Sequence, residues 1–70
     1  MLNDDIVRII KKFNSKGIKP TAEDIHNALR VEGKKYLLTT VIQELKMMRM
    51  YGYVDREVKG GTARWFVRKK

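Results

Sequence analysis

The sequence predicts an α+β fold in which three helices are followed by a small antiparallel hairpin, all within a single domain spanning residues 1–70. Two observations predict it. A helical pattern of apolar residues covers residues 38–50, and two β-prone runs, 53–58 and 62–67, come directly after it. The pair Gly60-Gly61 lies between those runs and is typical of a tight hairpin turn.

The first predicted helix covers residues 4–16, and its apolar residues form a broad stripe opposite basic ones. The run Asn3-Asp4-Asp5 supplies an N-cap and negative charge at the helix start, and Gly17 ends the helix. Residues 17–20 are predicted to be extended, because a proline disfavours helix at the residue before it. This segment is expected to form a short strand that pairs with the later hairpin.

A second predicted helix opens at Thr21, where Asp24 stands in the position of the carboxylate of a capping box. Its end is expected near Gly33, and residues 34–37 form the turn before the third helix. That helix is expected to end near Met50. The apolar residues predicted to form the core are Ile6, Ile9, Ile10, Phe13, Ile25, Leu29, Leu38, Val41, Leu45, Met48, Val54 and Trp65.

This order of elements is typical of a winged helix-turn-helix, in which the third helix fits a DNA major groove and the hairpin contacts the backbone or the minor groove. The charge distribution favours the same interpretation. Residues 1–33 carry six Lys and Arg against five Asp and Glu, whereas residues 34–70 carry ten against three, which gives a net charge of +8. The excess, including Lys69 and Lys70, indicates a polyanionic partner, and a merely solubilising surface is the alternative.

From Thr21 onward the sequence resembles the DNA-binding half of the ferric uptake regulator family. The matching residues are Ala22-Glu23-Asp24-Ile25, Val31-Glu32-Gly33, Thr40, Val41, Leu45 and Gly52 in the helical part, and Gly60, Gly61 and Trp65 in the hairpin. In that family the threonine-valine pair lies early in the recognition helix, and the last glycine of the helical part precedes the wing. The resemblance implies a winged-helix fold and DNA binding.

The sequence also departs from that family. The family places a tyrosine and an arginine after the threonine-valine pair, where they contact DNA, whereas this chain has Ile42 and Gln43 there. The family's metal-binding and dimerisation domain has no counterpart in residues 1–70, so metal sensing is not implied. In its small size the chain also resembles free-standing winged-helix proteins that are common in archaea and their viruses.

The residues predicted to bind double-stranded DNA lie on the third helix, the turn before it, and the hairpin. They are Lys34, Lys35, Tyr36, Thr39, Thr40, Gln43, Lys46, Lys59, Thr62, Arg64 and Arg68. Gln43 is expected to read a base edge, adenine by preference, while Thr39 and Thr40 contact phosphate or a thymine methyl. The basic residues are expected to hold phosphates. In the alternative interpretation Thr39 caps the helix, Gln43 is solvated, and the basic residues belong to an ordinary turn and a frayed tail.

The composition argues against several other classes of function. The chain has no cysteine, and its only histidine, His26, stands without neighbouring ligands. The only serine, Ser15, has no partnered histidine, so we expect no enzyme activity, no cofactor, no metal and no small-molecule substrate. No apolar run reaches the length of a membrane span, and the N-terminus lacks a signal-peptide pattern. A cytoplasmic location is therefore expected, with nucleoid association if the protein binds DNA.

The leading hypothesis is a sequence-specific transcription regulator that binds double-stranded DNA as a homodimer, because two copies double the contacts of a small module. The dimer interface is expected around Met47, Met50 and Tyr51, or on the exposed side of the first helix. The alternative from a different class is a winged-helix module that binds another protein through Phe66, Tyr51 and Met50. RNA binding also stays open, since basic charge does not distinguish the nucleic acids.

Overall fold

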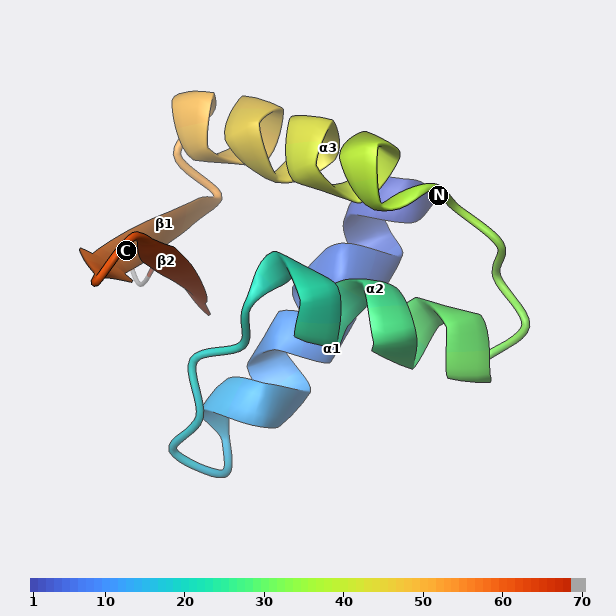
Figure 1. Cartoon of the computed structure of the whole chain (residues 1–70), viewed down its shortest axis with the longest axis horizontal. Coiled ribbons are helices and arrows are strands. Elements are labelled where there is room, and N and C mark those ends of the chain that lie inside the picture. The colour runs from blue at the N-terminus through green and yellow to red at the C-terminus, as the bar shows by residue number, and fades with distance from the viewer. Residues whose placement is uncertain (69–70) are drawn as a thin grey trace.

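A computed structural model describes residues 1–68 of the chain. Its elements, in order, are α1 (Leu2–Asn14), α2 (Ala22–Val31), α3 (Leu38–Met50), β1 (Val54–Lys59) and β2 (Thr62–Val67). In Figure 1, α3 runs across the top of the molecule, α2 crosses in front of α1 below it, and the hairpin lies at one side. The α+β fold is thus confirmed, and three helices followed by an antiparallel hairpin are compatible with a winged-helix topology.

Helix α1 lies two residues earlier in the chain than the sequence predicts. The N–H of Asp5 donates to the carbonyl of Met1 at 3.2 Å, so the first turn begins before the predicted N-cap run. Met1 provides no side-chain cap, but the acids of this turn still complement the helix dipole. At the other end, the N–H of Ile18 donates to the carbonyl of Phe13 at 3.0 Å and closes the helix around Gly17, as predicted.

The predicted strand over residues 17–20 does not form. The sheet of the described residues has two strands, β1 and β2. The segment receives a single backbone hydrogen bond from the hairpin, in which the N–H of Trp65 donates to the carbonyl of Pro20 at 2.8 Å. Because proline has no N–H, it cannot return a second bond to the strand. The neighbouring carbonyl, that of Lys19, accepts instead from the guanidinium of Arg64 at 3.1 Å.

Helix α2 begins with the capping box that the sequence predicts. Thr21 Oγ1 accepts from the N–H of Asp24 at 3.1 Å, and Asp24 Oδ2 accepts from the N–H of Thr21 at 3.0 Å. Helix α3 begins at Leu38, with Leu37 in the N-cap position and no side-chain cap. Thr39 therefore does not cap this helix, and its side chain lies on the exposed surface.

Glycines set the geometry of the hairpin and its junction with α3. Gly52 adopts a φ of +86°, a left-handed conformation that ends α3 and directs the chain into β1. β1 and β2 then pair antiparallel, from Val54 opposite Val67 to the turn at Gly60-Gly61. Both turn glycines have positive φ, as a two-residue type I′ turn requires. The predicted hairpin is confirmed.

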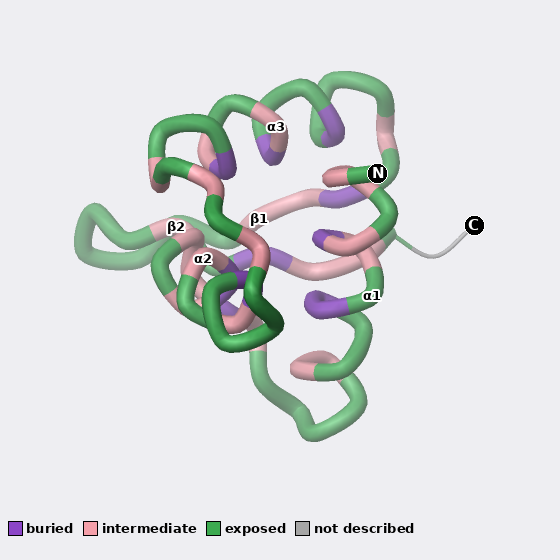
Figure 2. Tube along the Cα trace, turned by 90° about the vertical axis from the view of Figure 1, so that its right-hand side faces the viewer, coloured by how far each residue is buried: buried purple, intermediate pink, exposed green. Residues whose placement is uncertain are grey.

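The core lies where the three helices meet the inner face of the hairpin, and the buried segments in Figure 2 face this centre. Its buried residues are Ile6, Ile9, Ile10, Ile25, Leu29, Val41, Leu45, Met48, Val54 and Trp65, all of them predicted. Phe13 and Leu38, also predicted as core, are only half-buried. Leu38 is the first residue of α3, and Phe13 lines a groove between α1 and α2.

Two ion pairs tie α1 to the loop after α2. Arg8 binds Glu32 through hydrogen bonds of 2.6 and 2.9 Å, and Lys34 Nζ lies 2.8 Å from Asp5 Oδ1. The guanidinium of Arg8 lowers the pKa of Glu32, and the ammonium of Lys34 lowers the pKa of Asp5. The pKa of Asp55 is lowered as well, chiefly by a hydrogen bond from the backbone N–H of the next residue.

We expect the fold to lose stability in acid. A carboxyl whose pKa is lowered in the folded state stabilises the fold above its unfolded pKa, and this contribution is lost as the pH falls through the folded pKa. The free energy of unfolding should therefore decrease once the pH drops below the ordinary pKa values of these carboxyl groups, which are 4.5 for Glu32 and 3.8 for Asp5. Urea unfolding at a series of pH values measures this. Glu32→Gln should reduce the pH dependence of the free energy of unfolding. A urea midpoint of the wild type that does not change with pH would contradict the expectation.

Candidate nucleic-acid interface

Helix α3 presents an exposed row of side chains on the side opposite the core. This outer stripe consists of Thr39, Gln43, Lys46 and Met50. Spacings of four, three and four residues place them on one helix face, while Val41, Leu45 and Met48 bury the opposite face. Figure 2 shows the buried parts of α3 turned toward the molecule and the exposed parts turned away from it. Three predicted DNA-binding residues therefore share one accessible face.

Thr40, although predicted with them, lies on a neighbouring face of α3. Helical spacing places it with Glu44, Met47 and Tyr51. The last three residues border a groove of about 340 Å³ that also includes Asn3 near the start of α1. This second face, defined by Thr40, Glu44, Met47 and Tyr51, is therefore the side of α3 that adjoins α1, and it is more apolar than the outer stripe.

A cleft of about 290 Å³ separates α3 from the hairpin. Lys46 lines it from α3, and Arg56 and Thr62 line it from the hairpin. Residues at the start of α2, Ile42 of α3, and further residues of the hairpin that include Trp65 also line it. Because Lys46 also belongs to the outer stripe, the cleft joins the exposed face of α3 to the hairpin. Lys46 and Thr62, which are far apart in the sequence, are thus brought together.

Arg56 also lines this cleft, although it is not among the residues predicted to bind DNA. In the hairpin register it stands opposite Trp65, and its guanidinium carbon lies 5.8 Å from the centroid of the indole ring. It also follows Val54 by two residues, and Val54 is buried. Alternation along β1 therefore places Arg56 on the face of the hairpin that adjoins the cleft. That alternation is the sequence signal that identifies it.

The cations of the cleft are not neutralised by ion pairs. Within residues 1–68, no carboxylate lies within 4.0 Å of Lys46 or Arg56. By contrast, Arg49 of α3 is held by Asp55 at 3.0 Å. Glu23 is the one acidic residue in the cleft lining. The cleft therefore has an excess of positive charge that is available to an anionic ligand.

The three predicted residues of the turn before α3 have different surroundings. The ammonium of Lys34 is directed to Asp5 of α1 at 2.8 Å. Tyr36 is half-buried against the core, and its carbonyl oxygen lies 2.8 Å from Nε2 of His26. Lys35 is exposed. Of the three, Lys35 alone presents an exposed ammonium without a carboxylate partner in the described part of the chain.

Arg64 and Arg68 do not line the cleft. Arg64 points to the other face of the hairpin, where its guanidinium donates to the carbonyl of Lys19. Arg68 follows β2 and borders a hollow at the C-terminal end of α1. Lys59 is exposed beside the hairpin turn. The predicted basic tail at residues 69–70 lies outside the described residues.

Phe66, predicted as part of the surface that would bind another protein, is half-buried. The ammonium of Lys19 lies 4.8 Å from its ring centroid and 3.0 Å from a carboxylate oxygen of Glu57. The exposed aromatic side chains are Tyr51 and Tyr53, whose ring centroids are 6.5 Å apart. The exposed aromatic surface is therefore at the C-terminal end of α3, not at Phe66.

Among residues 1–68, no group of three or more His, Cys, Asp or Glu side chains is placed to hold a metal ion. That part of the chain also has no helix long and apolar enough to cross a bilayer. Comparison with protein-family models, curated proteins and solved structures finds no match. The resemblance to the ferric uptake regulators therefore stays an interpretation of the residues.

Proposed function

We propose that this protein is a winged-helix protein that binds double-stranded DNA in a sequence-specific manner. The outer stripe of α3 would enter the major groove, and the hairpin would contact the backbone or the minor groove. The observation that carries the proposal is the position of the outer stripe, which includes Lys46, across the cleft from Arg56. Neither cation has a carboxylate partner within residues 1–68. An α-helix has the width of the major groove, and unpaired cations bind phosphates with release of counterions.

Each group at the interface has chemistry that suits this role. The side-chain amide of Gln43 can donate to N7 and accept from the N6 amino group of one adenine. Thr39, in the first turn of α3, can contact a phosphate oxygen or a thymine methyl. Lys46 and Arg56 lie on opposite sides of the cleft, one from the helix and one from the hairpin, and can hold phosphates there. Lys35 and Lys59 would extend the phosphate contacts.

A transcription regulator acting as a homodimer is the biological role that we propose for this activity. A single module of this kind buries about 600–1,000 Å² on DNA, and a two-fold related pair doubles the contact. The second face of α3 suits a symmetric interface, since Met47 is 48% and Tyr51 68% exposed and both are next to the outer stripe. Two recognition helices would then lie on either side of the two-fold axis.

The exposed apolar residues favour a second candidate, a module that binds another protein. Met50 is 80% exposed, and Tyr51 and Tyr53 form an aromatic pair close to it in the chain. In that role these three residues would bind the partner, and the cations would keep the protein in solution. The two candidates differ in what binds, because DNA binding requires Lys46 and Arg56 whereas protein binding requires the apolar group.

Selection from random duplexes, followed by competition with other nucleic acids, tests the proposal. We expect one duplex sequence to be enriched and to displace a labelled probe better than scrambled duplex, structured RNA or single strands. Absence of any enriched sequence contradicts sequence-specific binding. Displacement by structured RNA at lower concentration than by the selected duplex identifies an RNA-binding protein instead.

Gln43→Ala is expected to reduce discrimination between the selected and scrambled duplexes roughly 5–150-fold, because a bidentate amide–adenine contact contributes about 1–3 kcal/mol of specificity. Its affinity for scrambled duplex should stay within about twofold of wild type. Asn27→Ala removes an exposed amide from α2 and is the matched control. Fluorescence anisotropy with both duplexes measures the ratio. Equal losses on the two duplexes would show that Gln43 does not read a base.

A further inference from the structure

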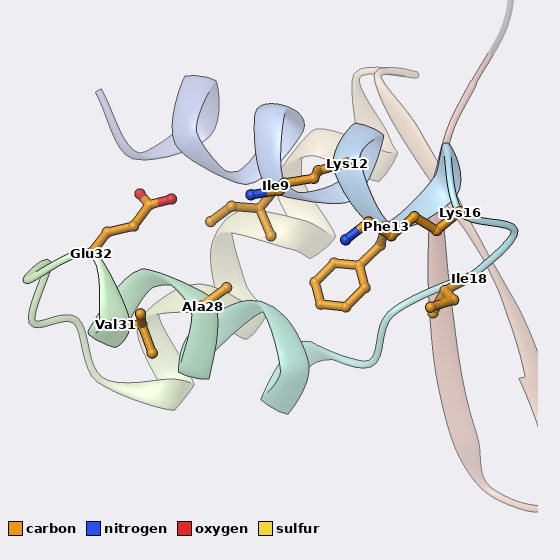
Figure 3. Close-up of a pocket in the computed structure, with 8 residues that line it drawn as sticks. All are labelled: Ile9, Lys12, Phe13, Lys16, Ile18, Ala28, Val31 and Glu32. Atoms are coloured by element: carbon orange, nitrogen blue, oxygen red, sulfur yellow. The ribbon is translucent and has the colours of Figure 1, made fainter.

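A groove of about 360 Å³ lies between α1 and α2, and it shares no lining residue with the cleft beside α3. Its apolar lining consists of Ile9, Phe13, Ile18, Ala28 and Val31. Figure 3 shows Ile9 and Phe13 extending from α1 toward α2, with Lys12 on α1 and Lys16 in the turn just after it. Val31 is 85% and Ile18 43% exposed, so much of this apolar surface is open to solvent.

The charged groups around the groove differ in whether they have an ion-pair partner. Glu32 borders it at one end, where Arg8 holds the carboxylate at 2.6 Å and connects α1 to the residue after α2. Lys12, in the last turn of α1, and Lys16, in the turn after the helix, also border it. No carboxylate of residues 1–68 lies within 4.0 Å of either ammonium. An apolar groove with two unpaired ammonium groups is complementary to an anion that carries an apolar tail.

We propose that this groove binds a small organic carboxylate with an apolar tail, of the medium-chain fatty-acid type. The carboxylate would accept hydrogen bonds from the ammonium groups of Lys12 and Lys16, which are charge-assisted and therefore strong. The tail would cover Phe13, Ala28 and Val31 and remove their exposed surface from water. The volume lies at the lower end of the range of about 300–1,000 Å³ for small-molecule sites.

The dimensions of the groove favour a small molecule over a partner helix. The Arg8–Glu32 ion pair bounds one end, and α2 contributes only ten residues to the length. Glu32 is already neutralised by Arg8, so the unpaired charge at the groove is positive and selects an anion. The proposal does not depend on DNA binding, since the two sites use different residues, and either can fail without the other.

Titration with sodium decanoate below its micelle concentration tests the proposal, with amide chemical shifts and the thermal midpoint as readouts. We expect saturable shifts around the groove, and a Tm that rises with ligand concentration because the ligand binds only the folded state. Decylamine, which has the same tail and the opposite charge, should bind at least about tenfold more weakly. Acetate, which lacks the tail, should give no saturable shifts. Decylamine binding as tightly as decanoate, or shifts centred on Met47 and Tyr51, would overturn the proposal.

Two variants locate the binding site. Lys12→Gln/Lys16→Gln should weaken decanoate binding at least about tenfold. Lys11→Gln/Lys35→Gln removes the same charge at exposed positions outside the groove and should change the affinity less than about twofold. Equal weakening by the two double variants would show non-specific attraction and overturn the site.

The apolar part of the groove is tested separately. Val31→Asn places a polar group at an exposed position, so it should leave the fold intact and weaken decanoate binding about fivefold. Val58→Asn, at an exposed position of the hairpin, is the matched control and should leave decanoate binding unchanged. Circular dichroism verifies that both variants are folded. An unchanged affinity for Val31→Asn would contradict the placement of the tail.

Binding measurements with vesicles and with peptides distinguish a soluble carboxylate ligand from a membrane or a protein partner. We expect decanoate to bind in the absence of any lipid surface. Binding to phosphatidylglycerol vesicles without binding of decanoate would identify a membrane contact and overturn the proposal. Binding of an acidic amphipathic peptide without binding of decanoate would likewise overturn it, in favour of a protein partner.

Discussion

Leu45→Ala is expected to lower the free energy of unfolding by about 2–5 kcal/mol, the range found for large-to-small substitutions of buried leucine. Leu45 is fully buried at the middle of the inner face of α3, within the core that the helices share with the hairpin. A domain of this length has a total stability of about 4–10 kcal/mol, so the loss is a large share of it. Urea unfolding, followed by far-UV circular dichroism and by the fluorescence of the single tryptophan, measures the change.

Met47→Ala is the control for this substitution. It shortens a side chain of the same helix two residues later, at a position that is 48% exposed. The free energy of unfolding should decrease by less than about 1 kcal/mol, because the substitution removes little buried apolar surface. If both variants lose the same free energy, the inner face of α3 does not organise the core as the structure describes.

The parts of the fold that the sequence predicts well depend on local spacing. Burial repeats at helical intervals along α1, α2 and α3, so the eight buried core residues of the helices are found from periodicity. The other two, Val54 and Trp65, belong to the β-prone runs of the hairpin. The two predicted core residues that are half-buried, Phe13 and Leu38, lie near the end of α1 and at the start of α3, where fewer neighbours cover a side chain. The capping box joins Thr21 and Asp24, which are three residues apart, and the hairpin turn is two glycines long. Such features involve no distant partner.

The features that the sequence does not predict depend on which distant group a residue meets. The guanidinium of Arg64 donates to the carbonyl of Lys19, 45 residues earlier, on the face of the hairpin away from the cleft. Lys34 is drawn to Asp5 of α1 in the same way. Alternation along β1 is enough to place Arg56 on the face of the cleft, but its lack of a carboxylate partner within residues 1–68 depends on the tertiary structure. A charge count in the sequence treats these cations alike, whereas tertiary contacts separate paired from unpaired ones.

Lys46→Gln/Arg56→Gln is expected to weaken DNA binding roughly 10–100-fold at low salt, because both cations are proposed to hold phosphates at the cleft. For the wild type, neutralisation of about five phosphates gives a slope of log K against log salt near −4 to −5. Each lost phosphate contact removes about 0.9 from the slope, so the double variant should have a slope shallower by about 2. Anisotropy titrations at several salt concentrations measure both quantities.

Lys12→Gln/Lys16→Gln is the matched control, because it changes the net charge by the same amount at the groove between α1 and α2. The long-range attraction of the protein for DNA decreases equally in the two double variants. Any difference between them therefore reports contacts made at the cleft, and the control should lose less than about threefold in affinity. Equal losses, with an equal change of slope, would mean that total charge and not the surface joining α3 to the hairpin determines binding. The proposed placement of α3 on the duplex would then be wrong.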